Sequence, residues 1–235
     1  MPLPLDHPTP ERAHRVYVAL TNHCNRSCPW CITCSSPRGR TFLTQEQFLA
    51  ALPPEGPFQL QLEGGEPTVH PQFHEFVRLA REHPRCERLV VCTNGAVLPR
   101  RKERLRAWLE EPGAPLTVKI SVNHHLLDHD PRLLDLCLSL RAVLRELGGD
   151  RQLVVNVRRR RGYDDDDRRV YDAVEAAGLL PDANVFFLQA YGFAKDAPDW
   201  ESPRLAGDRF TLVNPDGTVF GPDLVARSEG MRVLP

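Results

Sequence analysis

The chain has 235 residues, of which 26% are charged, and its 30 Lys and Arg against 31 Asp and Glu give a formal net charge of −1. This length allows one sizeable core, and the balanced charge argues against a dedicated nucleic-acid-binding protein, which usually has a basic excess. The start of the chain, Met1 to Pro8, lacks the basic residues and the apolar segment of a signal peptide, and no run is long enough to span a bilayer. The seven cysteines are therefore expected to be reduced thiols or metal ligands in a cytoplasmic protein without a membrane partner.

Six short apolar runs predict strands, and segments with helical periodicity or helix-capping signals separate them. The strands are expected at residues 15–20, 58–62, 89–92, 116–122, 153–157 and 184–189. The helices are expected at residues 44–52, 71–83, 100–111 and 133–147, and after the acidic run 164–167. Repeated β-α alternation indicates parallel strands with right-handed crossovers. The predicted fold is therefore α/β, a partial (β/α)6 barrel.

The end of the chain has a different pattern. Residues 210–213 and 218–220 flank the turn sequence Asn214-Pro215-Asp216-Gly217 and predict a β-hairpin. The preceding residues, 190–208, are rich in Pro, Asp and Gly and predict a long loop. We expect three parts: an N-terminal extension (1–14), the barrel (15–190) and a C-terminal loop and hairpin (191–235).

Three cysteines lie close together on the loop that leaves the first predicted strand. Cys24, Cys28 and Cys31 are spaced four and three positions apart, so they can converge on one metal centre without the rest of the chain. Thiolate is the soft ligand that iron–sulfur clusters and zinc select. An iron–sulfur site with three protein ligands leaves one iron free to bind another molecule. Zinc remains the alternative, since zinc sites also use closely spaced cysteines.

Other polar residues collect at the carboxyl ends of the predicted strands, where parallel α/β folds build their active sites. Packing alone does not explain this concentration. The residues are Gly64, Gly65 and Glu66 after the second strand, Thr93, Asn94 and Gly95 after the third, Ser121 and Asn123 at the fourth, Asn156 and Arg158 at the fifth, and Gln189 at the sixth.

Together these motifs resemble the signature of the radical S-adenosylmethionine (radical SAM) enzyme superfamily over roughly residues 15 to 190. The resemblance rests on Cys24-x3-Cys28-x2-Cys31 with Trp30 before the last cysteine, on Gly64-Gly65-Glu66-Pro67, and on Thr93-Asn94-Gly95. It implies that the three thiolates hold a 4Fe–4S cluster whose fourth iron binds the amino and carboxylate groups of SAM. It also implies an external electron donor, such as flavodoxin or ferredoxin, and cleavage of SAM to a 5′-deoxyadenosyl radical. That radical would abstract hydrogen from a peptide or a small metabolite.

The resemblance also implies which residues contact SAM. In the family the Gly-Gly-Glu segment meets the methionyl amine, so Gly64 and Gly65 would permit close backbone approach and Glu66 would accept hydrogen bonds from the ammonium group. The other assignments are Asn94 in the third-strand motif, Ser121 and Asn123 at the ribose or carboxylate, Arg158 at the carboxylate, and Gln189 and Trp30 at adenine. No catalytic residue is assigned, and oxidoreductase, lyase and isomerase chemistry all stay open.

Several residues have alternative interpretations. The fifth strand lacks the glycine-rich adenine motif of some family members, so the run Arg158–Arg161 has a solvated basic face as its alternative. Cys34 would block the open iron as a fourth ligand, so we expect a free thiol, with a hydrogen-donor role as the alternative. Cys92 and Cys137 are expected in the core. The segment 124–130, with His124, His125 and His129, is expected to be a surface loop, with substrate binding or proton relay as the alternative.

The C-terminal hairpin resembles the start of the extension in peptide-modifying members of the superfamily, which favours a peptide substrate. No cysteine follows Cys137, so an auxiliary cluster is not expected. Two other functions stay open. One is an activating enzyme that places a glycyl radical on a partner protein, and the other is a metal-binding module that keeps the fold without catalysis.

Overall fold

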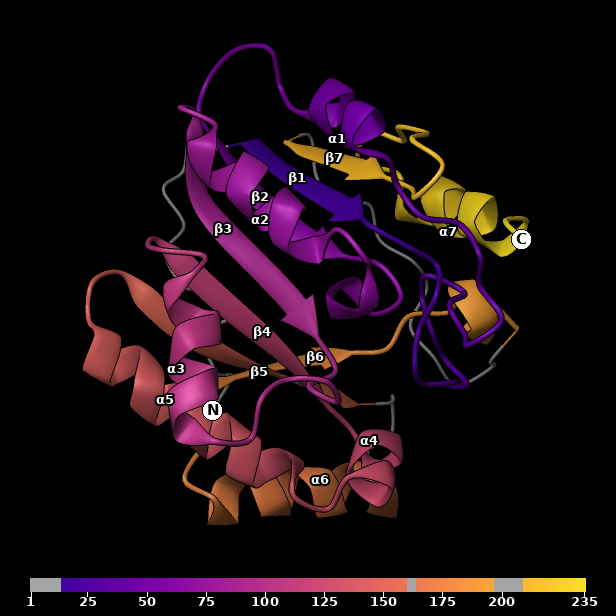
Figure 1. Ribbon diagram of the computed structural model, residues 1–235. Coiled ribbons are helices and arrows are strands. Elements are labelled where there is room, and N and C mark those ends of the chain that lie inside the picture. The colour runs from indigo at the N-terminus through magenta and orange to yellow at the C-terminus, as the bar shows by residue number, and fades with distance from the viewer. Residues whose placement is uncertain (1–13, 160–163, 197–208) are drawn as a thin grey trace.

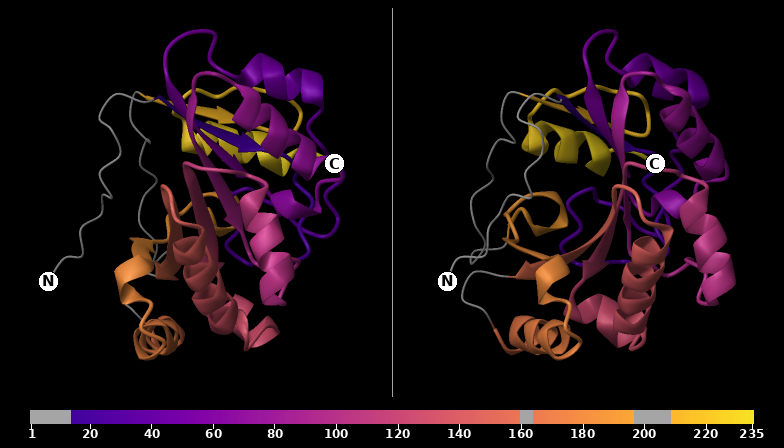
Figure 2. Two further views of the ribbon diagram at one scale, coloured as in Figure 1. Left: turned by 60° about the vertical axis from the view of Figure 1, so that its left-hand side comes forward. Right: turned by 90° about the vertical axis from the view of Figure 1, so that its left-hand side faces the viewer.

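The computed structural model describes residues 14–159, 164–196 and 209–235 (Figure 1). Within these residues, seven strands form one sheet in the order β6-β5-β4-β3-β2-β1-β7, and every neighbouring pair is parallel. The strands are β1 (His14–Ala19), β2 (Phe58–Glu63), β3 (Cys86–Thr93), β4 (Leu116–Val122), β5 (Arg151–Arg159), β6 (Ala183–Phe187) and β7 (Phe210–Val213). The sheet curls into a half-barrel (Figure 2). The predicted α/β fold, a partial barrel of parallel strands, is confirmed.

Helices α1 to α6 lie between the strands in the chain and cover one face of the sheet, and α7 follows the last strand. They are α1 (Gln45–Ala51), α2 (Phe73–Glu82), α3 (Lys102–Glu110), α4 (His124–His129), α5 (Leu133–Leu147), α6 (Asp165–Ala176) and α7 (Leu224–Arg232), with short 3-10 turns at Pro67–Val69, Leu180–Asp182 and Gly192–Ala194. The capping box predicted at Thr44 is present, because its hydroxyl accepts from Gln47 N and its own N–H donates to the Gln47 side chain. Among the described residues, no helix has the length and apolar character needed to cross a membrane.

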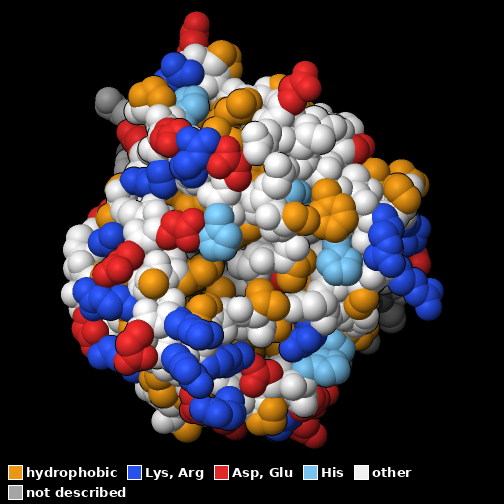
Figure 3. All heavy atoms as spheres, viewed as in Figure 1, with side chains coloured by type: hydrophobic (Ala, Val, Ile, Leu, Met, Phe, Trp, Pro, Cys, Tyr) orange, Lys and Arg blue, Asp and Glu red, His pale blue; other side chains and the backbone are white. Residues whose placement is uncertain are grey.

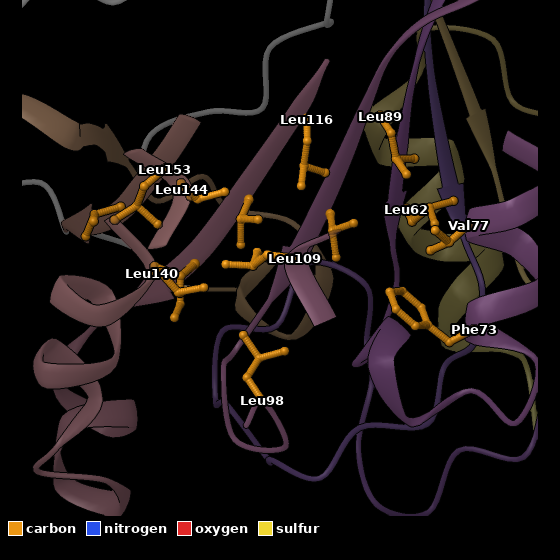
Figure 4. Close-up of a cluster of buried hydrophobic side chains, with 14 of the residues drawn as sticks. Leu62, Phe73, Val77, Leu89, Leu98, Leu109, Leu116, Leu140, Leu144 and Leu153 are labelled. Carbon is orange, nitrogen blue, oxygen red and sulfur yellow. The ribbon is translucent and has the colours of Figure 1, made fainter. Parts of the chain in front are cut away.

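The strands alternate between two environments because successive side chains point to opposite faces of a sheet. On β4, Val118 and Ile120 are fully buried under the helices, whereas Lys119 and Ser121 point to the other face and line a cavity. We call these the helix-covered face and the cavity face. The core lies between the helix-covered face and helices α2, α3 and α5 (Figure 4). Cys137 of α5 lies in this core, as predicted.

The outer surface of the helices is charged and mixed in sign. Figure 3 shows basic and acidic side chains intermixed over this side of the molecule. Many form exposed pairs within one helix, such as Arg78 with Glu82 at 2.5 Å and Arg106 with Glu110 at 3.0 Å. Such exposed pairs stabilise a fold by about 1 kcal/mol at most. The stability of the fold therefore rests on the core beneath them.

The structure corrects the sequence prediction in two places. Residues 124–129 form helix α4 rather than a surface loop, because Asn123 caps it by accepting a hydrogen bond from Leu126 N at 3.0 Å and because Leu126 and Leu127 are buried. Residues 210–213 form β7, which pairs in parallel with β1, so the hairpin joins the sheet. The predicted hairpin is present: Asn214 N donates to Thr218 O at 3.0 Å, Phe220 N donates to Leu212 O at 2.9 Å, and Val213 and Val219 form an antiparallel bridge.

Helix α7 was not predicted. It follows the hairpin and packs beside β7 at the edge of the sheet (Figure 1). Three groups of residues named in the sequence analysis lie outside the described residues: 1–13 of the N-terminal extension, Arg160 and Arg161 of the basic run, and 197–208 of the long loop.

Candidate functional site

A cavity of about 420 Å³ lies on the cavity face, at the carboxyl ends of the strands. Every strand contributes to its wall, and so do the loops that follow β1, β2 and β3. The cysteine loop supplies Cys24, Cys28 and Cys31. The next two loops supply Gly64, Gly65 and Asn94. The strands supply, among others, Tyr17, Gln61, Cys92, Thr93, Lys119, Asn156, Asn184 and Phe210. The topology thus brings together polar residues that are far apart in the sequence.

Two successive backbone turns run from Cys28 to Cys31 and from Cys31 to Cys34, and Cys24 precedes them with its N–H donating to Ser36 O at 3.0 Å. Cys31 N donates to Cys28 O at 3.1 Å, and Cys34 N donates to Cys31 O at 3.3 Å. Polar hydrogens already approach two of the sulfur atoms: Ser35 N lies 3.4 Å from Cys31 Sγ, and the Asn94 amide nitrogen lies 3.7 Å from Cys24 Sγ. Hydrogen bonds to sulfur stabilise thiolates and tune the potential of a cluster that they hold. The donor set therefore fits a thiolate-bound cluster.

Burial controls the ionisation of these thiols. It raises the pKa of Cys24 to about 12, with the nearby Glu66 charge adding to the effect, and it raises the pKa of Cys28 to about 11. Both groups are thus protonated near neutral pH until a metal binds, and metal binding would release their protons. Among the described residues, no three His, Cys, Asp or Glu side chains are placed to hold one metal ion.

Cys34 and Cys92 differ from the three cysteines in their surroundings. Cys34 does not line the cavity, and its sulfur lies 3.8 Å from the carbonyl oxygen of Ser228 in α7. Cys92 was predicted to be a core residue, and this is wrong: it is half-buried on the cavity face of β3 and lines the cavity. The two-residue period places Val91, not Cys92, under the helices. Burial raises the pKa of the Cys92 thiol to about 12.

Glu66 is fully buried beneath the rim of the cavity and does not line it. One carboxylate oxygen accepts from Thr68 Oγ1 at 2.5 Å, Thr68 N at 3.2 Å and Thr93 Oγ1 at 2.8 Å, and the other accepts from Asn94 N at 2.7 Å. Burial raises the pKa of Glu66, and these hydrogen bonds oppose the rise. Its side chain therefore braces the loop after β2 against the loop after β3. The structure does not bring it to the position expected for a contact with an ammonium group.

Gly64 and Gly65 lie against the backbone of the cysteine loop. Gly65 N donates to Thr21 O at 2.7 Å, and Glu66 N donates to His23 O at 2.9 Å. A Cβ on Gly65 would lie 2.0 Å from His23 O, and one on Gly64, where φ is +125°, would lie 2.5 Å from Thr21 O. Glycine is required at both positions because two backbones meet there.

Four of the other predicted SAM contacts line the cavity: Asn94, Ser121, Asn123 and Arg158. The oxygen of Asn123 is engaged as the cap of α4, which leaves its amide nitrogen for the cavity. Arg158 lies with its guanidinium carbon 5.6 Å from the centre of the Phe186 ring, and its buried Nε has no hydrogen-bond acceptor among the described residues. Its charge acts to lower the pKa of Cys28 and of Cys92.

Trp30 and Gln189 do not line the cavity. Trp30 is 6% exposed, packs with Leu188 and Ala194, and has its ring 4.9 Å from that of His124. The histidines of α4 thus support the cysteine loop from outside the cavity. Gln189 lies two residues beyond the end of β6, and its carbonyl oxygen accepts from Tyr191 N at 2.9 Å.

Sequence reasoning missed a chain of charged and polar side chains that crosses the cavity wall. Lys119 Nζ donates to the Gln61 side-chain oxygen at 2.8 Å, the Gln61 amide donates to Glu63, and Arg227 of α7 pairs with Glu63 at 2.5 Å. The alternation of β2 and β4 marks Gln61, Glu63 and Lys119 as residues of one face. Nothing in the sequence indicates that Arg227 joins them.

Comparison with known proteins gives one family and several relatives. A sequence profile of the Radical SAM superfamily matches residues 18–179. GTP 3',8-cyclase from Chlorobaculum tepidum is 31% identical over 93 residues, which are 38% of this chain and 28% of that protein. Molybdenum cofactor biosynthesis protein 1 from Drosophila melanogaster is 32% identical over 95 residues, 37% of this chain and 17% of that protein. The matched region thus spans less than a third of either relative.

Among solved structures, SuiB of Streptococcus suis bound to the precursor peptide SuiA has a TM-score of 0.62 at 11% sequence identity, covering 91% of this chain and 60% of that chain. SuiB bound to S-adenosylmethionine has a TM-score of 0.51 at 13% identity, covering 90% and 60%. At this identity the likeness concerns the fold.

Proposed function

The chain belongs to the radical SAM superfamily and is an enzyme of that class, and from this premise we propose that it holds one 4Fe–4S cluster through Cys24, Cys28 and Cys31 and binds SAM beside it. The observation that carries the proposal is that these three free thiols line one cavity together with Gly64 and Gly65. When bound, the reduced cluster supplies the electron that cleaves SAM to methionine and a 5′-deoxyadenosyl radical, which takes a hydrogen atom from the substrate.

The protein's own residues would orient SAM and exclude water. Arg158 is suited to the methionyl carboxylate, because it lines the cavity together with the three cysteines and its Nε lacks an acceptor among the described residues. Ser121 and the Asn123 amide nitrogen are suited to the ribose hydroxyls. For the methionyl amine we propose the Gly64–Gly65 backbone rather than the Glu66 carboxylate, since Glu66 lies outside the cavity and accepts from four protein donors. Cys34 has no part in holding the cluster.

The substrate is proposed to be a peptide or a small metabolite. A peptide is supported by SuiB, which shares the fold and was solved with a precursor peptide bound. A small metabolite is supported by the relatives named GTP 3',8-cyclase. In this chain Phe210, Leu212 and Leu224 of the C-terminal region form part of the cavity wall, so that region would contact the substrate. The electron is proposed to come from an external donor such as flavodoxin or ferredoxin, in the cytoplasm.

Anaerobic reconstitution tests this function. The protein is loaded with iron and sulfide, and its cluster is followed by absorption and its iron by analysis. SAM and dithionite are then added, and 5′-deoxyadenosine is quantified by chromatography. We expect a cluster and 5′-deoxyadenosine from the wild type and from Cys34→Ser, and neither from Cys28→Ser. A wild type with no cluster and no 5′-deoxyadenosine contradicts the proposal, and so does a Cys34→Ser variant that behaves like Cys28→Ser.

A further inference from the structure

Arg227 is a buried cation in the wall of the cavity. Its side chain is 4% exposed. Two of its nitrogens have partners: Nε donates to Asn214 Oδ1 at 3.2 Å, and one terminal nitrogen pairs with Glu63 at 2.5 Å. The other terminal nitrogen, Nη2, is buried and has no acceptor among the described residues. An unpaired donor on a buried charge is costly, and Arg227 is one of the residues that line the cavity.

Lys119 lies in the same wall and is held by the same chain of contacts. Its ammonium donates to Gln61, which donates in turn to the carboxylate that binds Arg227. No carboxylate among the described residues forms an ion pair with Lys119. Glu63 thus positions both cations, one directly and one through Gln61. These hydrogen-bonded side chains lie on the cavity face, so they take no part in packing the apolar core on the helix-covered face.

Four cations line the cavity: Arg26, Lys119, Arg158 and Arg227. Lys119 and Arg227 belong to one hydrogen-bonded chain, and with Glu63 between them they leave one positive charge. One carboxylate would neutralise that charge. The charge balance of this chain therefore favours a substrate carboxylate at this position.

We propose that Arg227 and Lys119 form a subsite that binds a carboxylate of the substrate, such as the side chain of an acidic residue in a peptide. This proposal rests on the function proposed above, because the bound molecule is a substrate only if the protein is that enzyme. Arg227 Nη2 and Lys119 Nζ donate charge-assisted hydrogen bonds to the carboxylate, and Glu63 and Gln61 hold the two donors in place. The subsite selects a carboxylate over an amide of the same shape, because an amide nitrogen would face a donor.

The test is a binding measurement on the reconstituted protein with saturating SAM and no reductant. Two probes of the same shape are titrated by calorimetry: N-acetylglutamate α-amide, which has a side-chain carboxylate, and N-acetylglutamine amide, which is neutral. We expect the acid to bind about tenfold more tightly than the amide, as one additional charge-assisted hydrogen bond would give. Arg227→Lys keeps the charge beside Glu63 but removes the second terminal nitrogen, and it is expected to abolish that preference.

Lys119→Gln is a second variant that leaves α7 untouched, and it should reduce the preference by a few-fold. Its matched control is Lys102→Gln on exposed α3, which pairs with Glu146 and should leave the preference unchanged. Thermal melting confirms that each variant is folded.

Equal binding of acid and amide by the wild type overturns the subsite, as does a preference that both Arg227→Lys and Lys119→Gln retain. Binding of tripolyphosphate but not of the acid overturns the choice of a carboxylate. Competition between the acid and SAM would show that these cations hold SAM itself, which also overturns it.

The same preparations are assayed for 5′-deoxyadenosine with dithionite and no substrate. A wild type that forms 5′-deoxyadenosine but shows no preference for the acid retains the proposed function and loses the subsite. A wild type that prefers the acid but forms no 5′-deoxyadenosine retains the subsite and loses the proposed function.

Discussion

The two faces of one sheet differ in what their side chains do. On the helix-covered face, Leu60, Leu62 and Ile120 are fully buried against α2, α3 and α5. On the cavity face, the adjacent residues Gln61, Glu63 and Lys119 are linked by hydrogen bonds around a cavity. The same strands therefore contribute to the stability of the fold through one face and to the proposed ligand binding through the other. Neighbouring substitutions on one strand should separate the two properties.

The largest expected effect on stability comes from the helix-covered face. Replacing Ile120 with Ala removes buried methyl groups and leaves a space in the core, which should cost about 2–5 kcal/mol. Its neighbour Ser121 is half-buried and lines the cavity. Ser121→Ala should change stability by less than about 0.5 kcal/mol but lower the yield of 5′-deoxyadenosine. Chemical denaturation and the SAM-cleavage assay measure the two effects. Equal losses of stability would contradict the division between the faces.

The next effect is expected where the cysteine loop meets the loop after β2. Gly65→Ala would place a Cβ 2.0 Å from His23 O, so the two backbones must separate. We expect a loss of about 1–3 kcal/mol together with reduced iron loading, since the cysteine loop would move. Gly178→Ala is the control: its φ is +64°, but its Cβ would meet nothing within 4 Å. It should cost about 1 kcal/mol with full iron loading. Normal iron loading in Gly65→Ala would show that this contact does not position the cysteines.

How far the sequence predicts this molecule differs between the two faces. The helix-covered face follows from apolar periodicity, and the six predicted strands and the capping box at Thr44 are confirmed. Helix α4 was missed because its buried residues are only Leu126 and Leu127 among histidines. The pairing of β7 with β1 was not predicted, because the two strands lie at opposite ends of the chain and the local pattern of β7 indicates only a hairpin.

At the site, motif reasoning places Cys24, Cys28 and Cys31 on one loop, and the structure brings all three to one cavity. Motif reasoning does not give the environment of Glu66, because that environment depends on hydrogen bonds from Thr68 and Thr93, which lie at the ends of different strands. Local pattern carries no information on such contacts between distant segments. For the same reason Arg227, which meets Glu63 across 164 residues, could not be found.

The Glu66 side chain links the loop after β2 to the loop after β3, and the pH dependence of stability tests this link. Burial raises the pKa of Glu66 above its ordinary value, so the folded protein retains a proton at pH values where the unfolded chain has released it. The contribution of this group to stability is therefore largest at low pH and falls as pH rises through the folded pKa. Glu66→Gln removes the titration, and it costs about 1–3 kcal/mol because its amide nitrogen would face Asn94 N.

The measurement is denaturation of the apo wild type and of Glu66→Gln between pH 4 and pH 8. We expect the stability advantage of the wild type to shrink as the pH rises. A constant difference across this range would mean that Glu66 titrates alike in the folded and unfolded states.

The smallest effect is expected at the opposite end of the sheet from the cavity, where Arg88 of β3 pairs with Asp150, the residue before β5. The Arg88 hydrogen bond lowers the pKa of Asp150. The side chain of Asp150 is 59% exposed, so solvent screening limits the pair to less than about 1 kcal/mol. A depressed pKa means that this contribution is present above the unfolded pKa and is lost as pH falls through the folded one. Asp150→Asn should thus cost a few tenths of a kcal/mol at pH 7 and progressively less as the pH falls through the folded pKa, and it should leave the yield of 5′-deoxyadenosine unchanged. If SAM cleavage fell with this substitution, the charges at the two ends of the sheet would be coupled, and the assignment of recognition to the cavity face alone would be wrong.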